Sequence, residues 1–263
     1  MFGCKTANLL PSEKHNQYKY GISLTYENET LKIDLKNPLE CPLRIWLFSS
    51  NTELQNKLNE ITPITLESKS DTILFFPNIQ KFNDEIKSIS RLGSTKKDVE
   101  SIEMDLPFPQ NKTYKVLQPN ETNFTHNTSW SRYALDFNLK LNDTICSASD
   151  GFVVGIVDKY KFGGIGKEWG DYANYLTIYD PVSGIFCQYV HLVQNGVLVR
   201  MGGKIKRGQN IALAGNTGRS TEEHLHFSCL IPENDDNGLK SIPIKFIGGI
   251  EGIKLKKGEK LKK

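Results

Sequence analysis

Two histidines separated by a single residue are the clearest chemical feature of this sequence. They belong to the run His224-Leu225-His226-Phe227. Side chains of a β-strand alternate between its two faces, so both imidazoles are expected on one face, about 7 Å apart along the chain. Imidazole suits zinc as a ligand, and Leu225 and Phe227 would point into a core. The pair therefore indicates a metal site, although many such pairs are surface histidines on an ordinary strand.

A second candidate strand contains an aspartate among apolar residues, in the run Arg132-Tyr133-Ala134-Leu135-Asp136-Phe137. Alternation places Asp136 on the face opposite the aromatic and aliphatic side chains. A lone aspartate there is usually solvated, so Asp136 becomes a candidate site residue only if its face of the strand meets the face that carries the histidines. His126 lies ten residues upstream, in Asn123-Phe124-Thr125-His126, and by itself is expected to be a surface loop histidine.

A third candidate is His191, in the run Tyr189-Val190-His191-Leu192. Strand alternation predicts that His191 shares a face with Tyr189 and Cys187. A hydrogen-bonded core histidine is the default interpretation of this pattern. The floor of a polar cleft fits it as well.

The second half of the chain resembles the lysostaphin/LytM-type metallopeptidases. The resemblance covers roughly the last 155 residues, and the first hundred or so show no resemblance to a named family. Its combination of motifs in the right order is specific, although each motif alone is weak. In addition to the three runs above, the motifs are Leu106-Pro107-Phe108-Pro109, Tyr114-Lys115-Val116, Phe124-Thr125-His126, Asp150-Gly151, Gly163-Gly164, Asp171-Tyr172-Ala173-Asn174-Tyr175 and Gly215-Asn216-Thr217-Gly218.

This resemblance implies one zinc ion per chain, held by His126, Asp136 and His226. Three protein ligands with an open position are typical of a catalytic rather than a structural zinc. The remaining histidines, His191 and His224, would act on the attacking water, the oxyanion or the leaving amine. The sequence does not divide these roles between them.

Two features depart from the usual family pattern. The first ligand histidine commonly stands four residues before the aspartate, where this chain has Arg132, which stays protonated and cannot bind zinc. A subgroup has its histidine further upstream, and His126 matches that form. Glu222 and Glu223 replace the usual small residues and proline. They would be solvated loop charges, or would raise the pKa of a neighbouring histidine or favour an amine-bearing substrate.

Strand patterns dominate the whole chain, and helix signals are scarce. Short β-rich runs are predicted at 21–26, 30–35, 43–48, 64–67 and 72–76, and further strands follow between residues 131 and 230. We predict an all-β protein: a β-sandwich-like N-terminal domain, then a LytM-type antiparallel β-sheet catalytic domain. The resemblance also implies a duplicated hybrid motif with a hairpin barrel. The predicted boundaries are 1–18 (terminal extension), 19–104 (N-terminal β-domain), 105–250 (peptidase domain) and 251–263 (basic tail).

Composition limits the classes of function. The 263 residues carry 33 basic and 30 acidic side chains, a formal charge of +3, which predicts no nucleic-acid partner. Lys254–Lys263 is expected to be a solvated, disordered tail, with weak attraction to an anionic polymer as the alternative. No apolar run predicts a transmembrane helix, and no complete signal peptide is visible. The five cysteines form no CxxC pair, so buried free thiols are favoured; whether Cys4 is lipidated stays open.

The sequence thus predicts a zinc endopeptidase that cuts bacterial cell-wall peptidoglycan in the periplasm or outside the cell. Its partners would be stem or cross-bridge peptides and, as a further possibility, a regulatory protein. The alternative is a non-catalytic LytM-like domain that binds the envelope or activates another hydrolase. Such relatives usually lack zinc ligands, whereas all candidate positions are filled here. The bond that is cut, the role of the N-terminal domain and the oligomeric state are not predicted.

Overall fold

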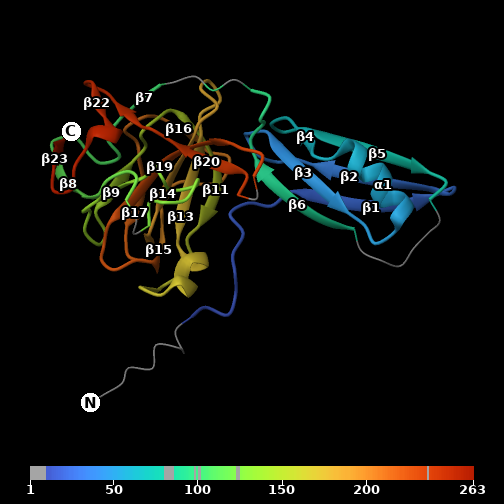
Figure 1. The fold of residues 1–263 in the computed structure, drawn as a ribbon, viewed down its shortest axis with the longest axis horizontal. Helices are drawn as coiled ribbons and strands as arrows, with labels where there is room; N and C mark the ends of the chain where they lie inside the picture. Colours follow the sequence, from blue (N-terminus) through green and yellow to red (C-terminus); the bar gives the residue numbers. More distant parts are fainter. Residues whose placement is uncertain (1–9, 80–85, 98, 100–101, 123–124, 236) are drawn as a thin grey trace, which may run out of the picture. The chain divides into compact units, whose positions relative to one another are not determined.

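The computed structural model describes residues 10–79, 86–97, 99, 102–122, 125–235 and 237–263 (Figure 1). The chain forms two compact units, which we call the site unit and the N-terminal unit. The site unit comprises Met1–Tyr18, Val99–Ile231 and Lys240–Lys263, and the N-terminal unit comprises Lys19–Asp98 and Pro232–Leu239. None of the helices among the described residues is long and apolar enough to cross a membrane.

The N-terminal unit contains two three-stranded antiparallel sheets, which agrees with the sandwich-like expectation. The first has the order β1 (Gly21–Glu27), β2 (Thr30–Lys36) and β5 (Asp71–Pro77), and the second β4 (Ile64–Leu66), β3 (Leu43–Phe48) and β6 (Lys87–Leu92). In β2 the buried residues Leu31, Ile33 and Leu35 alternate with more exposed ones. This period of two is the pattern of a strand with one face in the core.

One α-helix, α1 (Thr52–Ile61), corrects the expectation that this half contains strands alone. The Asn51 side chain accepts a hydrogen bond from the Leu54 N–H and thereby caps the helix. Leu54 and Leu58 are buried one turn apart. Because only these two positions form the apolar stripe, the helical periodicity in the sequence is weaker than the strand patterns on either side of it.

A segment from the second half of the sequence, Pro232–Leu239, belongs to the N-terminal unit. The buried guanidinium of Arg44 holds it by donating to the carbonyl oxygens of Glu233, at 2.9 Å, and Gly238, at 2.6 Å. The same guanidinium donates to the carbonyl oxygens of Leu92 and Gly93. A buried charge is tolerated when its donors are satisfied in this way. The units therefore do not divide at a single point in the sequence, because this segment lies within the predicted domain 105–250.

A nine-stranded sheet forms the centre of the site unit. Its strands follow the order β16 (Lys204–Ile205), β11 (Gly151–Val157), β13 (Tyr175–Tyr179), β14 (Phe186–Val190), β19 (Leu225–Pro232), β9 (Leu135–Phe137), β8 (Thr113–Gln118) and β23 (Lys260–Lys262), with β20 (Leu239–Ile242) paired to β19. The pairings given for this sheet are antiparallel. The all-β prediction is confirmed, and the strands described here close no barrel.

Smaller elements surround the nine-stranded sheet. They are the sheets β10 (Thr144–Cys146)–β17 (Asn210–Ala214)–β15 (Leu192–Val197), β12 (Gly163–Gly164)–β18 (Gly218–Arg219) and β22 (Ile250–Glu251)–β21 (Lys245–Phe246)–β7 (Glu103–Met104), and the 3-10 helices η2 (Lys167–Tyr172) and η3 (Gly252–Lys254). Phe137, Tyr189 and Phe227 are fully buried in the core of the site unit. That core gives the strands β9, β14 and β19 a rigid backing.

The predicted basic tail, 251–263, is ordered, so the expectation of a disordered terminus was wrong. Its last strand, β23, pairs antiparallel with β8, and Leu261 is buried in the core. The Lys263 ammonium lies 2.7 Å from the Asp105 carboxylate. Lysines alternate with buried leucines here, and the strand needs no further apolar residues because it sits at an edge and buries one face only.

We predict that a fragment of residues 99–263 folds by itself, because its hydrophobic core lies wholly between Val99 and Leu261. It should show a cooperative thermal transition by circular dichroism. The loop 232–239 would lose the hydrogen bonds from Arg44, so reduced stability is expected. An insoluble fragment, or one without a cooperative transition where the full chain folds, would show that the two units fold only together.

Candidate metal centre and cleft

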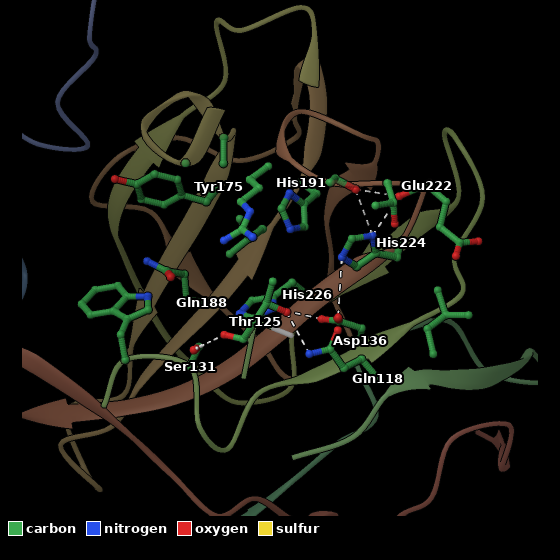
Figure 2. Close-up of a pocket in the computed structure, with 18 of the residues that line it drawn as sticks. Gln118, Thr125, Ser131, Asp136, Tyr175, Gln188, His191, Glu222, His224 and His226 are labelled. Atoms are coloured by element: carbon green, nitrogen blue, oxygen red, sulfur yellow. Dashed lines mark hydrogen bonds and ion pairs between the residues drawn. The ribbon is translucent and has the colours of Figure 1, made fainter. Parts of the chain in front are cut away.

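One cleft of the site unit has a volume of about 570 Å³, and four of the five histidines lie at it or directly behind it. His191, His224, His226 and Asp136 line this cleft, and Figure 2 shows them together. His126 is fully buried beside them. The structure thus brings together every site residue that the sequence predicted.

Three donor atoms of this group converge on one point. His126 Nε2 lies 3.3 Å from both His226 Nδ1 and Asp136 Oδ1, and His226 Nδ1 lies 2.9 Å from Asp136 Oδ1. The β9–β19 pairing creates this arrangement, because it places His226 directly opposite Asp136. His126 reaches the same point from the loop before β9.

This donor set fits zinc. Two imidazole nitrogens and a carboxylate oxygen are common zinc ligands, with bonds of about 2.0–2.2 Å. In a tetrahedron of that size, ligand atoms are about 3.4 Å apart, close to the separations of 2.9–3.3 Å found here. Metal binding therefore requires little rearrangement of these side chains.

The loop that carries His126 is held by hydrogen bonds. The ring Nδ1 of His126 donates to the Pro119 carbonyl at 2.8 Å, which leaves the Nε2 lone pair directed at the cluster. The Gln118 side chain donates to the Thr125 hydroxyl at 2.8 Å, and the Ser131 hydroxyl donates to the Thr125 carbonyl at 2.7 Å. His126 is thus a positioned residue rather than a surface histidine. Asn123 and Phe124 of its motif lie outside the described residues.

The carboxylate of Asp136 is held in its ionised form. Burial by itself would raise its pKa, but side-chain hydrogen bonding with His126 and His226, together with the charges of His226 and His224, holds the pKa well below its usual range. Burial lowers the pKa of His226, against the opposing effect of Asp136. An ionised carboxylate and a neutral imidazole are the forms that bind a metal.

His191 reaches the cleft through an unusual backbone conformation. Its φ is +67°, in the left-handed region, between the ends of β14 and β15. The prediction that His191 shares a face with Tyr189 and Cys187 was wrong, because both of those side chains lie in the core. Gln188 and Val190 line the cleft instead, and the left-handed turn brings His191 to the same side.

A network behind His191 fixes its ring. His191 Nδ1 donates to the Thr217 carbonyl at 2.7 Å. The Thr217 hydroxyl donates to the Leu192 carbonyl at 2.8 Å and accepts a hydrogen bond from the Asn174 N–H. Position 218, directly after Thr217, requires glycine: its φ is +77°, and a Cβ there would approach the Ala173 Cβ to 2.5 Å. The motifs around Asn174 and Thr217 were visible in the sequence, but their positioning roles were not.

His224 is also oriented by a hydrogen bond from its Nδ1 to a backbone carbonyl. Its Nδ1 donates to the Glu222 carbonyl at 2.8 Å, and its Nε2 lies 3.8 Å from Asp136 Oδ2. The ring centroids of His191 and His224 are 4.5 Å apart. Glu222 lines the cleft, but Glu223 is not among the lining residues. Both histidines therefore have Nδ1 engaged by a carbonyl, and Nε2 remains for a ligand in the cleft.

Burial lowers the pKa of His191 to about 3, with further lowering by His224 and His226. His191 is thus neutral at neutral pH and can accept a hydrogen bond or a proton at Nε2. Arg132, at the position where many family members have a ligand, is exposed. The arrangement can hold a metal with three ligands and place two proton-transferring groups beside it.

Three convergent metal ligands beside two further oriented histidines are the arrangement expected of a metallohydrolase site. Residues 131–237 match the model of peptidase family M23. Over these residues the match confirms the resemblance to the lysostaphin/LytM-type metallopeptidases. His126 lies before the matched residues, and so does the strand β8.

Several known proteins are similar to this chain. The peptidoglycan DD-endopeptidase ShyB of Vibrio cholerae is 37% identical over 110 residues, which are 41% of this chain and 23% of ShyB. An uncharacterized metalloprotease of Buchnera aphidicola is 31% identical over 132 residues, 49% of this chain and 32% of the relative. The chain thus aligns with less than a third of the length of these relatives.

Among solved structures, the catalytic domain of lysostaphin from Staphylococcus simulans is 21% identical, with a TM-score of 0.35, covering 50% of this chain and 88% of that domain. LytU has 22% identity and a TM-score of 0.38, covering 49% of this chain and 81% of LytU.

Proposed function

We propose that this protein is a zinc-dependent endopeptidase that hydrolyses peptide bonds in bacterial cell-wall peptidoglycan. The convergence of His126 Nε2, His226 Nδ1 and Asp136 Oδ1 within 3.3 Å of one another carries the proposal. These residues would hold one zinc ion per chain. When bound, zinc supplies a Lewis acid that polarises the scissile carbonyl and lowers the pKa of water to about 7.

His191 and His224 would perform the proton transfers. Each has its Nδ1–H fixed on a backbone carbonyl, so each presents Nε2 to the cleft in a defined orientation. One imidazole takes a proton from the attacking water at Nε2. The other, once protonated, donates a hydrogen bond to the developing oxyanion or a proton to the leaving amine.

The names of the relatives support the proposed substrate class. ShyB is named as a peptidoglycan DD-endopeptidase. The residues of this chain that match the M23 family model, 131–237, include Asp136, His191 and the histidine pair. A stem-peptide or cross-bridge peptide of peptidoglycan would occupy the cleft. The site of action would then be the cell envelope, in the periplasm or outside the cell, and a regulatory protein partner remains part of the proposal.

A non-catalytic LytM-like domain is the weaker alternative. Such a domain has no need of a complete ligand set or of two further oriented histidines. Here Asp136, His126 and His226 are preorganised, and carbonyl hydrogen bonds orient His191 and His224. Preorganised donors of this kind are expected in a site that performs chemistry.

We expect the purified protein to contain about one zinc per chain, and to release soluble peptides from purified peptidoglycan. Elemental analysis gives the stoichiometry, and removal of the metal by a chelator should abolish hydrolysis until zinc is returned. A matched sample treated with chelator and then magnesium should stay inactive, because magnesium prefers oxygen ligands. Metal-replete protein without zinc, with a second stoichiometric zinc, or with zinc but no hydrolysis of peptidoglycan would each contradict the proposal.

A further inference from the structure

The cleft carries charged side chains beyond the metal centre. Arg219, Glu222 and Lys257 line it, two cations and one carboxylate. Among the described residues, the Lys257 ammonium has no hydrogen-bond or ion-pair partner in the protein. A cation that lines a substrate cleft without a partner is available to a substrate anion. Lys257 also lies outside the residues that match the peptidase family, 131–237.

The backbone around Lys257 is firmly held. The Gly258 N–H donates to the Val116 carbonyl at 2.8 Å, and the Val116 N–H donates to the Glu259 carbonyl at 2.9 Å. Gly258 permits this turn because its φ is +88°. Strand β23 then continues the pairing with β8, and Leu261 anchors it in the core. Lys257 is thus presented by a fixed turn rather than by a free tail.

The turn lies close to the metal centre. Its partner Val116 is followed in β8 by Leu117 and Gln118, which line the same cleft, and Gln118 pairs with Asp136 on β9. The turn is therefore two strand spacings from Asp136, about 10 Å between backbones. An extended peptide advances about 3.3–3.6 Å per residue, so this distance corresponds to about two or three residues.

We propose that Lys257 is a specificity-determining residue that binds a carboxylate of the peptide substrate about two or three residues from the scissile bond. This inference rests on the proposed peptidase function, and it specifies the chemistry that the cleft selects. Lys257 and Arg219 balance the carboxylates of Asp136 and Glu222 in the cleft, and a divalent metal at the centre would add positive charge. A peptide with free carboxylates complements that charge.

The test compares two probes: soluble cross-linked peptidoglycan fragments, and the same fragments with their carboxylates converted to amides. Lys257→Gln should lower kcat/KM on the native fragments by about 5- to 10-fold, mainly through KM, as expected for one charge-assisted hydrogen bond at a partly exposed position. The loss should shrink to less than about twofold on the amidated probe. It should also shrink at high salt, because ions screen an exposed charge pair.

Lys256→Gln is the matched control, because Lys256 is an exposed neighbour that is not among the cleft residues. It should behave like the unchanged protein on both probes. Equal losses for Lys257→Gln on both probes, or no loss on the native one, would overturn the inference. Binding can also be measured without turnover. For this, the dissociation constant for native fragments is compared between His224→Ala and the double variant that also carries Lys257→Gln. Absence of hydrolysis by the unchanged protein would contradict the peptidase function, whereas an unaltered dissociation constant for Lys257→Gln would contradict the role of Lys257.

Discussion

Replacing His126 with alanine should leave a folded protein that has lost its zinc and its hydrolytic activity. His126 Nε2 is one of three converging donor atoms, and the remaining pair, Asp136 and His226, cannot hold the metal as firmly. Loss of an outer-shell partner alone typically lowers metal affinity by about 10- to 100-fold. Removing a ligand should therefore weaken zinc binding by more than about 100-fold, which competition with a chromophoric chelator can measure.

The matched control is His15→Ala. His15 is the one histidine outside the metal centre and cleft, and its ring contacts Tyr160 instead. This control should keep the zinc and the activity of the unchanged protein. Circular dichroism should show that His126→Ala retains its fold, since Thr125 and Ser131 still order the loop. Full zinc occupancy and hydrolysis in His126→Ala would show that another group is the third ligand. Absence of hydrolysis from the unchanged protein would favour the non-catalytic alternative.

The sequence predicted the parts of this site that depend on strand alternation. His224 and His226 reach one face because they are two residues apart, and Asp136 faces away from Leu135 and Phe137 for the same reason. The meeting of the two faces could not be derived from alternation, because it depends on the pairing of β9 with β19. For His126 only the family resemblance and elimination were available, since a loop ligand leaves no periodic signal.

The expectations that failed depend on geometry that periodicity does not encode. His191 departs from strand alternation because its φ is +67°. Helix α1 has only two buried positions, so its apolar stripe is weak. Strand β23 buries one leucine between lysines and depends on the free edge of β8. For His191 and β23 the position depends on a contact with a distant part of the chain, Thr217 and β8 respectively, which local sequence does not contain.

Changing His191 or His224 to alanine should abolish hydrolysis, as His126→Ala does, but should leave the zinc bound. Neither His191 nor His224 belongs to the set of converging metal ligands, and both rings present Nε2 to the cleft. Each change should lower kcat by about 100-fold or more, which corresponds to about 2.7 kcal/mol of transition-state stabilisation. KM should change little, because proton transfer and oxyanion stabilisation act in the transition state rather than on the bound substrate.

His226→Ala is the matched variant for this assignment, because His226 lies only two residues from His224 and on the same face of the strand. It should lose zinc together with activity, since His226 Nδ1 lies 2.9 Å from Asp136 Oδ1. His224 Nε2 lies 3.8 Å from the other oxygen of the same carboxylate. If His224→Ala lost the metal and His226→Ala kept it, the roles within the pair would be reversed. The double change of His191 and His224 should cost little more than either single change, because residues that act as one proton-transfer unit are not additive.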